Sequence, residues 1–171
     1  DGFRWNDTAL GAALSAALMA SAQAAIKLSD PIPVGPQVKV GKLANGLTYY
    51  IHKNGKPEKK VELRLVIKAG SILEDEDQRG LAHFLEHLAF NGSKNFKKHE
   101  LVSYLQSIGV KFGADLNAYT SFDETVYILP IPTNNRDNLD KGFLVLQDWA
   151  QGLTLDDAAI ASELVVAYST D

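Results

Sequence analysis

The stretch of residues 80–90 constrains the fold of this chain most, because it combines helical periodicity with a cluster of polar side chains. It reads Gly-Leu-Ala-His-Phe-Leu-Glu-His-Leu-Ala-Phe, which predicts one amphipathic helix. At about 100° per residue, His83 and His87 lie one turn apart on the same face, and Glu86 falls beside them. Two imidazoles and a carboxylate therefore converge on one side of the predicted helix.

This combination of side chains suits a zinc site. Histidines at positions i and i+4 of a helix can each bring a ring nitrogen to one Zn²⁺ at about 2.0–2.1 Å. Glu86 would then lie near a water molecule on the metal and act as its general base. The order His-x-x-Glu-His reverses the more familiar His-Glu-x-x-His and is known as the inverzincin motif. The sequence therefore predicts that His83 and His87 bind the metal and that Glu86 acts on water.

The alternative is a chance match, because a histidine in an apolar helix is more often a core or surface residue. The rest of the helix argues against it. Leu81, Leu85 and Leu88 form an apolar row that we expect to lie on a sheet. The two histidines and the glutamate share another face, which needs a different explanation.

Composition narrows the kind of site further. At 171 residues, 46% hydrophobic and 22% charged, the chain suits one globular domain with its own core. It has no cysteine, so it has neither disulfides nor a thiolate metal site, and a metal must be held by histidine and carboxylate. The net charge of −4 gives no indication of nucleic-acid binding.

The first 25 residues resemble an export signal. Residues 9–25 are almost wholly small and apolar, and Ala22-Gln23-Ala24 fits the small-x-small pattern of a signal-peptidase site. The run is too short for a convincing membrane span, which needs about 20 apolar residues. An ordinary alanine-rich helix is the alternative. We expect a periplasmic or otherwise exported protein, with a proline-rich linker at residues 26–37 and one domain at residues 38–171.

The remaining pattern predicts the element order β-β-β-α-α-β-β-α-α. Asn45-Gly46 between apolar runs predicts a hairpin, and the acidic run of residues 74–77 predicts a solvated loop. A last helix is expected near Thr154 as its N-cap. This order indicates an α+β fold, a mainly antiparallel sheet with helices packed on one face. The predicted strands are 38–40, 47–51, 61–67 and two within 113–130, and the other predicted helices are 80–90, 100–108 and 139–149.

Several segments together resemble the pitrilysin/insulin-degrading-enzyme family of zinc peptidases, including its bacterial periplasmic members. They are Asn45-Gly46-Leu47, Gly70-Ser71, the block from His83 to Lys94, and Asn117-Ala118-Tyr119-Thr120-Ser121. The resemblance implies a zinc endopeptidase of the same α+β fold, with His83 and His87 as zinc ligands and Glu86 as the base. It also implies that a peptide substrate adds to the sheet edge along Asn117, Ala118, Tyr119 and Thr120.

The family's third zinc ligand has two candidates in this chain. The family places a glutamate some seventy-five residues beyond the second histidine, and Glu163 has 75 residues between it and His87. The family also carries two glutamates seven residues apart in its last helix, and the context of Glu163 resembles the first of them. The second, which is the ligand, then falls at Thr170, where a hydroxyl is a poor replacement for a carboxylate. The spacing from His87 therefore indicates Glu163 as the position of the third ligand, whereas the pattern of paired glutamates indicates Thr170.

The resemblance further implies an N-terminal fragment of a longer enzyme, so that residues 38–171 form an incomplete metallopeptidase domain. Full-length relatives close a second half over the cleft, and we expect that half, or a partner subunit, to be required alongside a peptide or unfolded-protein substrate. Two other functions stay open. The chain could be a non-catalytic, peptide-binding partner subunit, or an inactive truncated form of the peptidase.

Overall fold

The computed structural model describes residues 32–111, 113 and 117–169, with the backbone but not the side chains of residues 164–169. The expected signal segment, residues 26–31 of the expected linker and Thr170 lie outside these residues. The described residues follow the predicted order, with two short 3₁₀ helices added before the first α-helix. The elements are β1 (Val38–Lys42), β2 (Thr48–His52), β3 (Lys60–Ile67), η1 (Ser71–Leu73), η2 (Glu76–Gln78), α2 (Leu81–Leu88), α3 (Glu100–Ser107), β4 (Asn117–Thr120), β5 (Thr125–Pro132), α4 (Arg136–Gln151) and α5 (Asp157–Ser169).

The chain divides into two compact units at Lys53. In the first unit, β1 and β2 form an antiparallel two-stranded sheet, as the Asn-Gly signal predicts. Gly46 has a φ of +91°, a left-handed conformation that glycine adopts without steric penalty. The Asn45 side chain accepts a hydrogen bond from the Leu47 N–H at 3.1 Å, which stabilises the turn.

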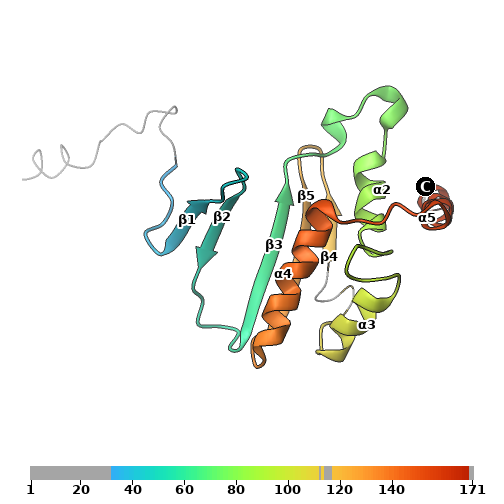
Figure 1. Ribbon diagram of the computed structural model, residues 1–171. Helices are drawn as coiled ribbons and strands as arrows, with labels where there is room; N and C mark the ends of the chain where they lie inside the picture. Colours follow the sequence, from blue (N-terminus) through green and yellow to red (C-terminus); the bar gives the residue numbers. More distant parts are fainter. Residues whose placement is uncertain (1–31, 112, 114–116, 170–171) are drawn as a thin grey trace, which may run out of the picture. The chain divides into compact units, whose positions relative to one another are not determined.

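The second unit, which holds the predicted metal helix, is built on a three-stranded antiparallel sheet in the order β3-β5-β4 (Figure 1). Leu63 of β3 pairs with Leu129 of β5, and Ala118 of β4 pairs with Tyr127 of β5. The strand β4 therefore lies at one edge of this sheet.

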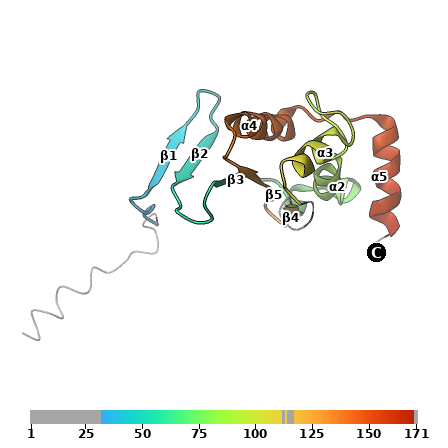
Figure 2. The ribbon, with the colours of Figure 1, turned by 90° about the horizontal axis from the view of Figure 1, so that it is seen from below.

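Helices cover one face of the sheet, as the sequence predicts. Figure 2 shows α4, α3 and α2 in one layer against the strands, with α5 beside α2. The helix α4 packs on β3 and β5, α2 packs on β4 and β5, and α5 packs on α2 rather than on the sheet. Within the described residues, no helix is both long enough and apolar enough to span a membrane.

Only one residue of the expected leucine row of α2 is buried. Leu88 is buried, but Leu81 and Leu85 are 54% and 41% exposed. The other buried residue of α2 is Glu86, and Ala89, which follows the helix, is buried as well. Helical periodicity alone did not predict that the face with Glu86 is buried. That burial depends on a distant hydroxyl on β4, which donates a hydrogen bond to the Glu86 carboxylate.

Two helices begin at different residues from those expected. The helix α5 begins at Asp157 rather than after Thr154, because the Asp156 carboxylate accepts hydrogen bonds from the N–H groups of Ala158 and Ala159 at 2.9 and 3.1 Å. The helix α4 begins at Arg136, three residues before the expected Leu139. Its N-cap is Asn135, whose side chain accepts from the Asp137 N–H at 3.0 Å.

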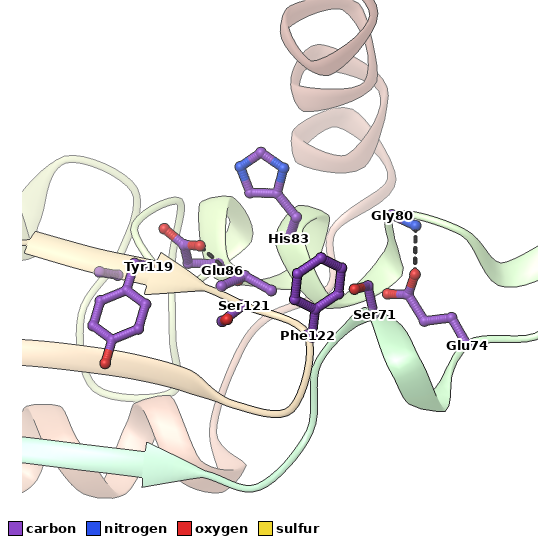
Figure 3. Close-up of a pocket in the computed structure, with 10 residues that line it drawn as sticks. Ser71, Glu74, Gly80, His83, Glu86, Tyr119, Ser121 and Phe122 are labelled. Atoms are coloured by element: carbon purple, nitrogen blue, oxygen red, sulfur yellow. Dashed lines mark hydrogen bonds between the residues drawn. The ribbon is translucent and has the colours of Figure 1, made fainter.

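The loop at η1 is hydrogen-bonded to the β4–β5 turn (Figure 3). The Ser71 N–H donates to the Ser121 carbonyl at 3.2 Å, and the Ile72 N–H donates to the Phe122 carbonyl at 2.9 Å. This close approach requires glycine at position 70, because a Cβ there would clash with the Ser121 carbonyl oxygen. The two loops form one wall beside α2.

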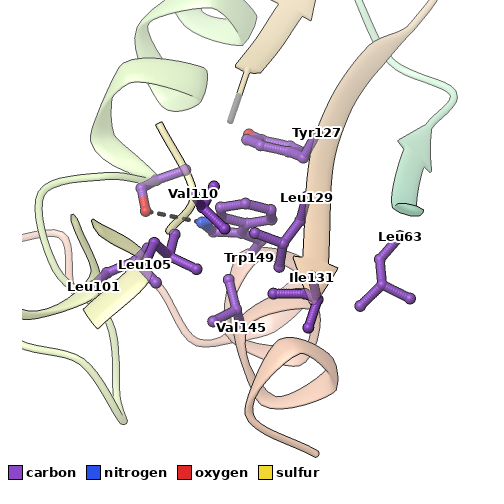
Figure 4. Packing of buried hydrophobic residues seen from close by; sticks show 10 residues of the cluster. Leu63, Leu101, Leu105, Val110, Tyr127, Leu129, Ile131, Val145 and Trp149 are labelled. Carbon is purple, nitrogen blue, oxygen red and sulfur yellow. Dashed lines mark hydrogen bonds between the residues drawn. The ribbon is translucent and has the colours of Figure 1, made fainter. Parts of the chain in front are cut away.

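The core lies between the sheet and the helix layer (Figure 4). Trp149 of α4 stacks on Tyr127 of β5, with ring centroids 5.1 Å apart. Its indole N–H donates to the Ala89 carbonyl at 3.1 Å, so the core also fixes the C-terminal end of α2. The buried cluster is Leu63, Ala89, Leu101, Leu105, Val110, Tyr127, Leu129, Ile131, Val145 and Trp149.

Truncating a central core residue should destabilise the fold strongly. Leu129 has no exposed surface, so Leu129→Ala removes apolar contacts and leaves a cavity, which costs about 2–5 kcal/mol. The same change at Leu155, which is 57% exposed, should cost less than about 0.5 kcal/mol. Urea unfolding followed by tryptophan fluorescence measures both. Equal losses in the two variants would contradict this description of the core.

Candidate metal centre

The side chains of His83 and His87 meet on the exposed side of α2. Their Nε2 atoms are 3.1 Å apart, and the rings are nearly perpendicular at 85°. Two ring nitrogens this close need a proton or a cation between them, because their lone pairs repel. Two ligands of a tetrahedral zinc at 2.0–2.1 Å are separated by about 3.3–3.4 Å, which is close to the observed distance. The pair therefore fits a metal ion.

The opposite edge of His87 contacts α5. Its Nδ1 lies 3.3 Å from the Glu163 Oε2, and the Asn91 side-chain amide donates to the Glu163 Oε1 at 2.6 Å. When Nδ1 carries the proton, the ring donates to Glu163 and its Nε2 lone pair stays free. This carboxylate–histidine contact is the usual way in which proteins orient a metal-binding histidine.

The structure brings Glu163 to His87 but not to both histidines. Among the described residues, no three histidine, cysteine, aspartate or glutamate side chains form a group that could hold a metal ion. The alternative candidate, Thr170, lies outside the described residues. Which position supplies a third ligand therefore stays a prediction.

Glu86 points to the sheet side of α2 and is only 9% exposed. The Thr120 hydroxyl on β4 donates to the Glu86 Oε2 at 2.6 Å, which offsets part of the cost of burying the carboxylate. Burial raises the pKa of Tyr127 to about 12, and the negative charge of Glu86 contributes to the rise. Thr120 is expected from the sequence to lie on the substrate strand, but no local sequence signal reveals its bond to Glu86.

A cavity of about 650 Å³ opens beside these groups (Figure 3). It reaches His83 and Glu86 on one side and the edge strand β4 on the other. Of the four residues expected to bind substrate, Ala118, Tyr119 and Thr120 line the cavity, and Asn117 does not. Its remaining lining residues are Ser71, Glu74, Gly80, Ser121 and Phe122.

Glu74 has a role that the sequence did not indicate. The acidic run was expected to be only a solvated loop, but the Glu74 carboxylate accepts from the Gly80 N–H at 2.7 Å and from the Ala82 N–H at 2.8 Å. It thus caps the first turn of α2, where Gly80 has a φ of +89° and no side chain of its own to do so. These backbone bonds lower the pKa of Glu74. A capping side chain six residues before the N-cap residue has no recognised sequence signature.

Comparison with known proteins identifies the family of this chain and agrees with its fold. The sequence profile of the insulinase family, peptidase family M16, matches residues 49–170. A probable zinc protease PqqL from Haemophilus influenzae is 44% identical over 126 residues, which cover 74% of this chain and 14% of the relative. The chain therefore belongs to the insulinase family of peptidases, as its motifs predicted.

Solved structures of the family share the fold. The first half of the periplasmic protease PqqL from Escherichia coli superposes with a TM-score of 0.78 at 35% identity, covering 82% of this chain and 30% of that one. A ferredoxin protease, FusC, in complex with Arabidopsis ferredoxin superposes with a TM-score of 0.68 at 26% identity, covering 78% and 15%. The predicted α+β architecture is thus confirmed, and the chain spans only a small part of these relatives.

The stability that the Glu74 cap contributes should depend on pH in a defined direction. Because the folded pKa of Glu74 lies below its ordinary value of 4.5, its contribution is present above that value and is lost as the pH falls through the folded pKa. Glu74→Gln should therefore lower the urea midpoint at pH 7, and its difference from the wild type should shrink towards pH 3.

Glu76→Gln is the matched control, because Glu76 is exposed and pairs only with exposed Arg79. A Glu74→Gln difference that stays constant from pH 7 to pH 3, or that equals the control, would contradict the capping role.

Proposed function

We propose that this chain forms the metal-binding half of a zinc-dependent endopeptidase active site. The observation that carries the proposal is the 3.1 Å approach of the His83 and His87 Nε2 atoms on the same helix as the buried Glu86 carboxylate. The names of its zinc protease relatives support the same activity.

His83 and His87 would hold the zinc ion through their Nε2 atoms. Both rings must then be unprotonated at Nε2, and the Glu163 carboxylate favours this tautomer in His87 by accepting a hydrogen bond from the Nδ1–H. Bound there, Zn²⁺ would polarise a peptide carbonyl and lower the pKa of a water molecule.

Glu86 would act as the general base. Its Oε2 is held by Thr120, which fixes the orientation of the carboxylate and leaves the other oxygen free to accept a proton. Glu86 borders the same cavity as His83, so an attacking water molecule can lie within its reach. The carboxyl group can then return the proton to the leaving amine of the cleaved peptide.

The substrate would be a peptide or an unfolded polypeptide bound along β4. This strand lies at the edge of the β3-β5-β4 sheet, and an extended chain can add to such an edge by main-chain hydrogen bonds. Residues Ala118, Tyr119 and Thr120 of this strand line the cavity that contains Glu86, which would bring the bound peptide bond to the base.

A longer chain or a partner subunit would complete the enzyme. The chain corresponds to 14% of the Haemophilus influenzae relative, so most of that protein lies outside the matched region. The Escherichia coli relative is described as periplasmic, and together with the signal-like segment of residues 1–25 this supports export of the present protein to the same kind of compartment.

Zinc binding should depend on both histidines. The purified chain should bind about one Zn²⁺, and His83→Ala and His87→Ala should each abolish stoichiometric binding, because either change removes one of the paired nitrogens. Metal content by elemental analysis after dialysis measures this. His52→Ala, on β2 in the other unit, is the control. Full zinc in the double histidine variant would contradict the site.

A zinc titration separates the two candidates for the third ligand. If Glu163 orients His87, Glu163→Ala should weaken zinc binding about 10–100-fold, and Thr170→Glu should strengthen it by adding a carboxylate. Complete loss of zinc in Glu163→Ala, with no gain in Thr170→Glu, would make Glu163 a direct ligand. A wild-type chain that binds peptide but no zinc would favour the non-catalytic subunit instead.

Glu86→Gln should separate metal binding from hydrolysis. The amide has nearly the same shape but cannot accept the proton, so zinc content should stay at the wild-type level. Hydrolysis of a quenched fluorescent peptide by the completed enzyme should fall about 10²–10⁴-fold. Glu62→Gln, on the exposed side of β3, should change neither quantity. Loss of zinc as complete as in the histidine variants would show that Glu86 is a ligand rather than the base.

A further inference from the structure

A second buried carboxylate, outside the cavity, belongs to Asp148 near the C-terminal end of α4. It is only 2% exposed, and both of its oxygens accept hydrogen bonds. The Oδ2 accepts from the Ser93 hydroxyl at 2.6 Å and from the Asn95 N–H at 2.9 Å, and the Oδ1 accepts from the Asn95 side-chain amide at 2.7 Å. Burying a charge is costly unless it is fully hydrogen-bonded, so this carboxylate must hold its three donors in place.

The donors belong to the segment that directly follows the metal helix. Ser93 and Asn95 lie five to seven residues beyond the end of α2, and Ser93 pairs with Leu153 in an isolated antiparallel bridge. Two more main-chain bonds flank this bridge. The Lys94 N–H donates to the Gly152 carbonyl at 2.7 Å, and the Thr154 N–H donates to the Gly92 carbonyl at 3.1 Å.

The partner segment, residues 152–154, leads directly into α5. Asp148 therefore anchors the junction at which the exit from α2 and the entry to α5 are paired. Gly152 leaves the space that this requires, because a Cβ there would lie 2.8 Å from the Asp148 Oδ1.

The two segments carry the polar groups around His87. Asn91, two residues before Ser93, donates to Glu163, and Glu163 on α5 contacts His87 on α2. A shift of one segment along the other would break this Asn91–Glu163–His87 chain, because each of its contacts spans the junction between α2 and α5.

We infer that Asp148 is a positioning residue of the metal centre, which fixes the register of α5 against α2 and so sets Glu163 against His87. The expected effect of Asp148 on zinc binding rests on the proposed function. The register itself can be tested without metal.

The experiment compares Asp148→Asn with Asp140→Asn, the same chemical change at an exposed position of the same helix. One readout is the zinc dissociation constant, measured by competition with a chromogenic chelator at a temperature where near-ultraviolet circular dichroism shows both variants folded. The other is the tautomer of His87 in the metal-free chain, read from long-range ¹H–¹⁵N correlation spectra. A role confined to global stability would change neither of these in folded protein.

Asp148→Asn should raise the zinc dissociation constant at least about tenfold and replace a single Nδ1-protonated tautomer of His87 by an averaged signal. Asp140→Asn should match the wild type in both. An Asp148→Asn variant with zinc affinity within about twofold of wild type and an unchanged His87 signal overturns the inference. If the wild type binds no zinc, the proposed metal centre fails, and the His87 signal alone decides the register.

Ser93 provides the second test if Asp148→Asn does not fold. Ser93→Ala removes one of the three donors, and Ser93→Thr keeps a hydroxyl at the same position. Ser93→Ala should shift both readouts in the same direction as Asp148→Asn, and Ser93→Thr should restore them. Equal behaviour of the alanine and threonine variants would overturn the inference.

Discussion

The position of α2 is the constraint on which the candidate site depends, and hydrogen bonds fix the helix at both ends. At its N-terminus the Glu74 carboxylate accepts from two backbone N–H groups, and at its C-terminus the Trp149 indole donates to the Ala89 carbonyl. Since α2 has only eight residues, it has little stability of its own. These bonds from Glu74, which follows η1, and from Trp149 of α4 therefore determine where its histidines lie.

Three carboxylates around α2 are buried or half-buried, and each has its own donors. Thr120 donates to Glu86, Asn91 donates to Glu163, and Ser93 and Asn95 donate to Asp148. Such bonds offset the desolvation of each charge and give the side chain one orientation. These hydrogen bonds thus orient Glu86, Glu163 and Asp148, while the apolar core holds the helices and strands together.

The sequence predicted the element order and the fold class because hydrophobic periodicity, the Asn-Gly turn and glycine positions are local signals. It also placed His83, Glu86 and His87 on one helix, since spacing along a helix determines angular position.

Prediction from the sequence failed where contacts come from distant residues. The capping role of Glu74, the bond from Thr120 and the inward face of α2 all depend on tertiary neighbours that the local pattern does not specify. The expected start of α5 at Thr154 failed for a related reason, because the Thr154 N–H bonds to Gly92 and Asp156 caps the helix instead.

The central claim is that the paired imidazoles of α2 bind one zinc ion. Anomalous diffraction at the zinc absorption edge, from crystals of the chain grown with zinc, tests it most directly. The account predicts one strong peak within about 2.0–2.1 Å of the Nε2 atoms of both His83 and His87. A peak held by other residues, or no peak at this pair in crystals that contain zinc elsewhere, would contradict it.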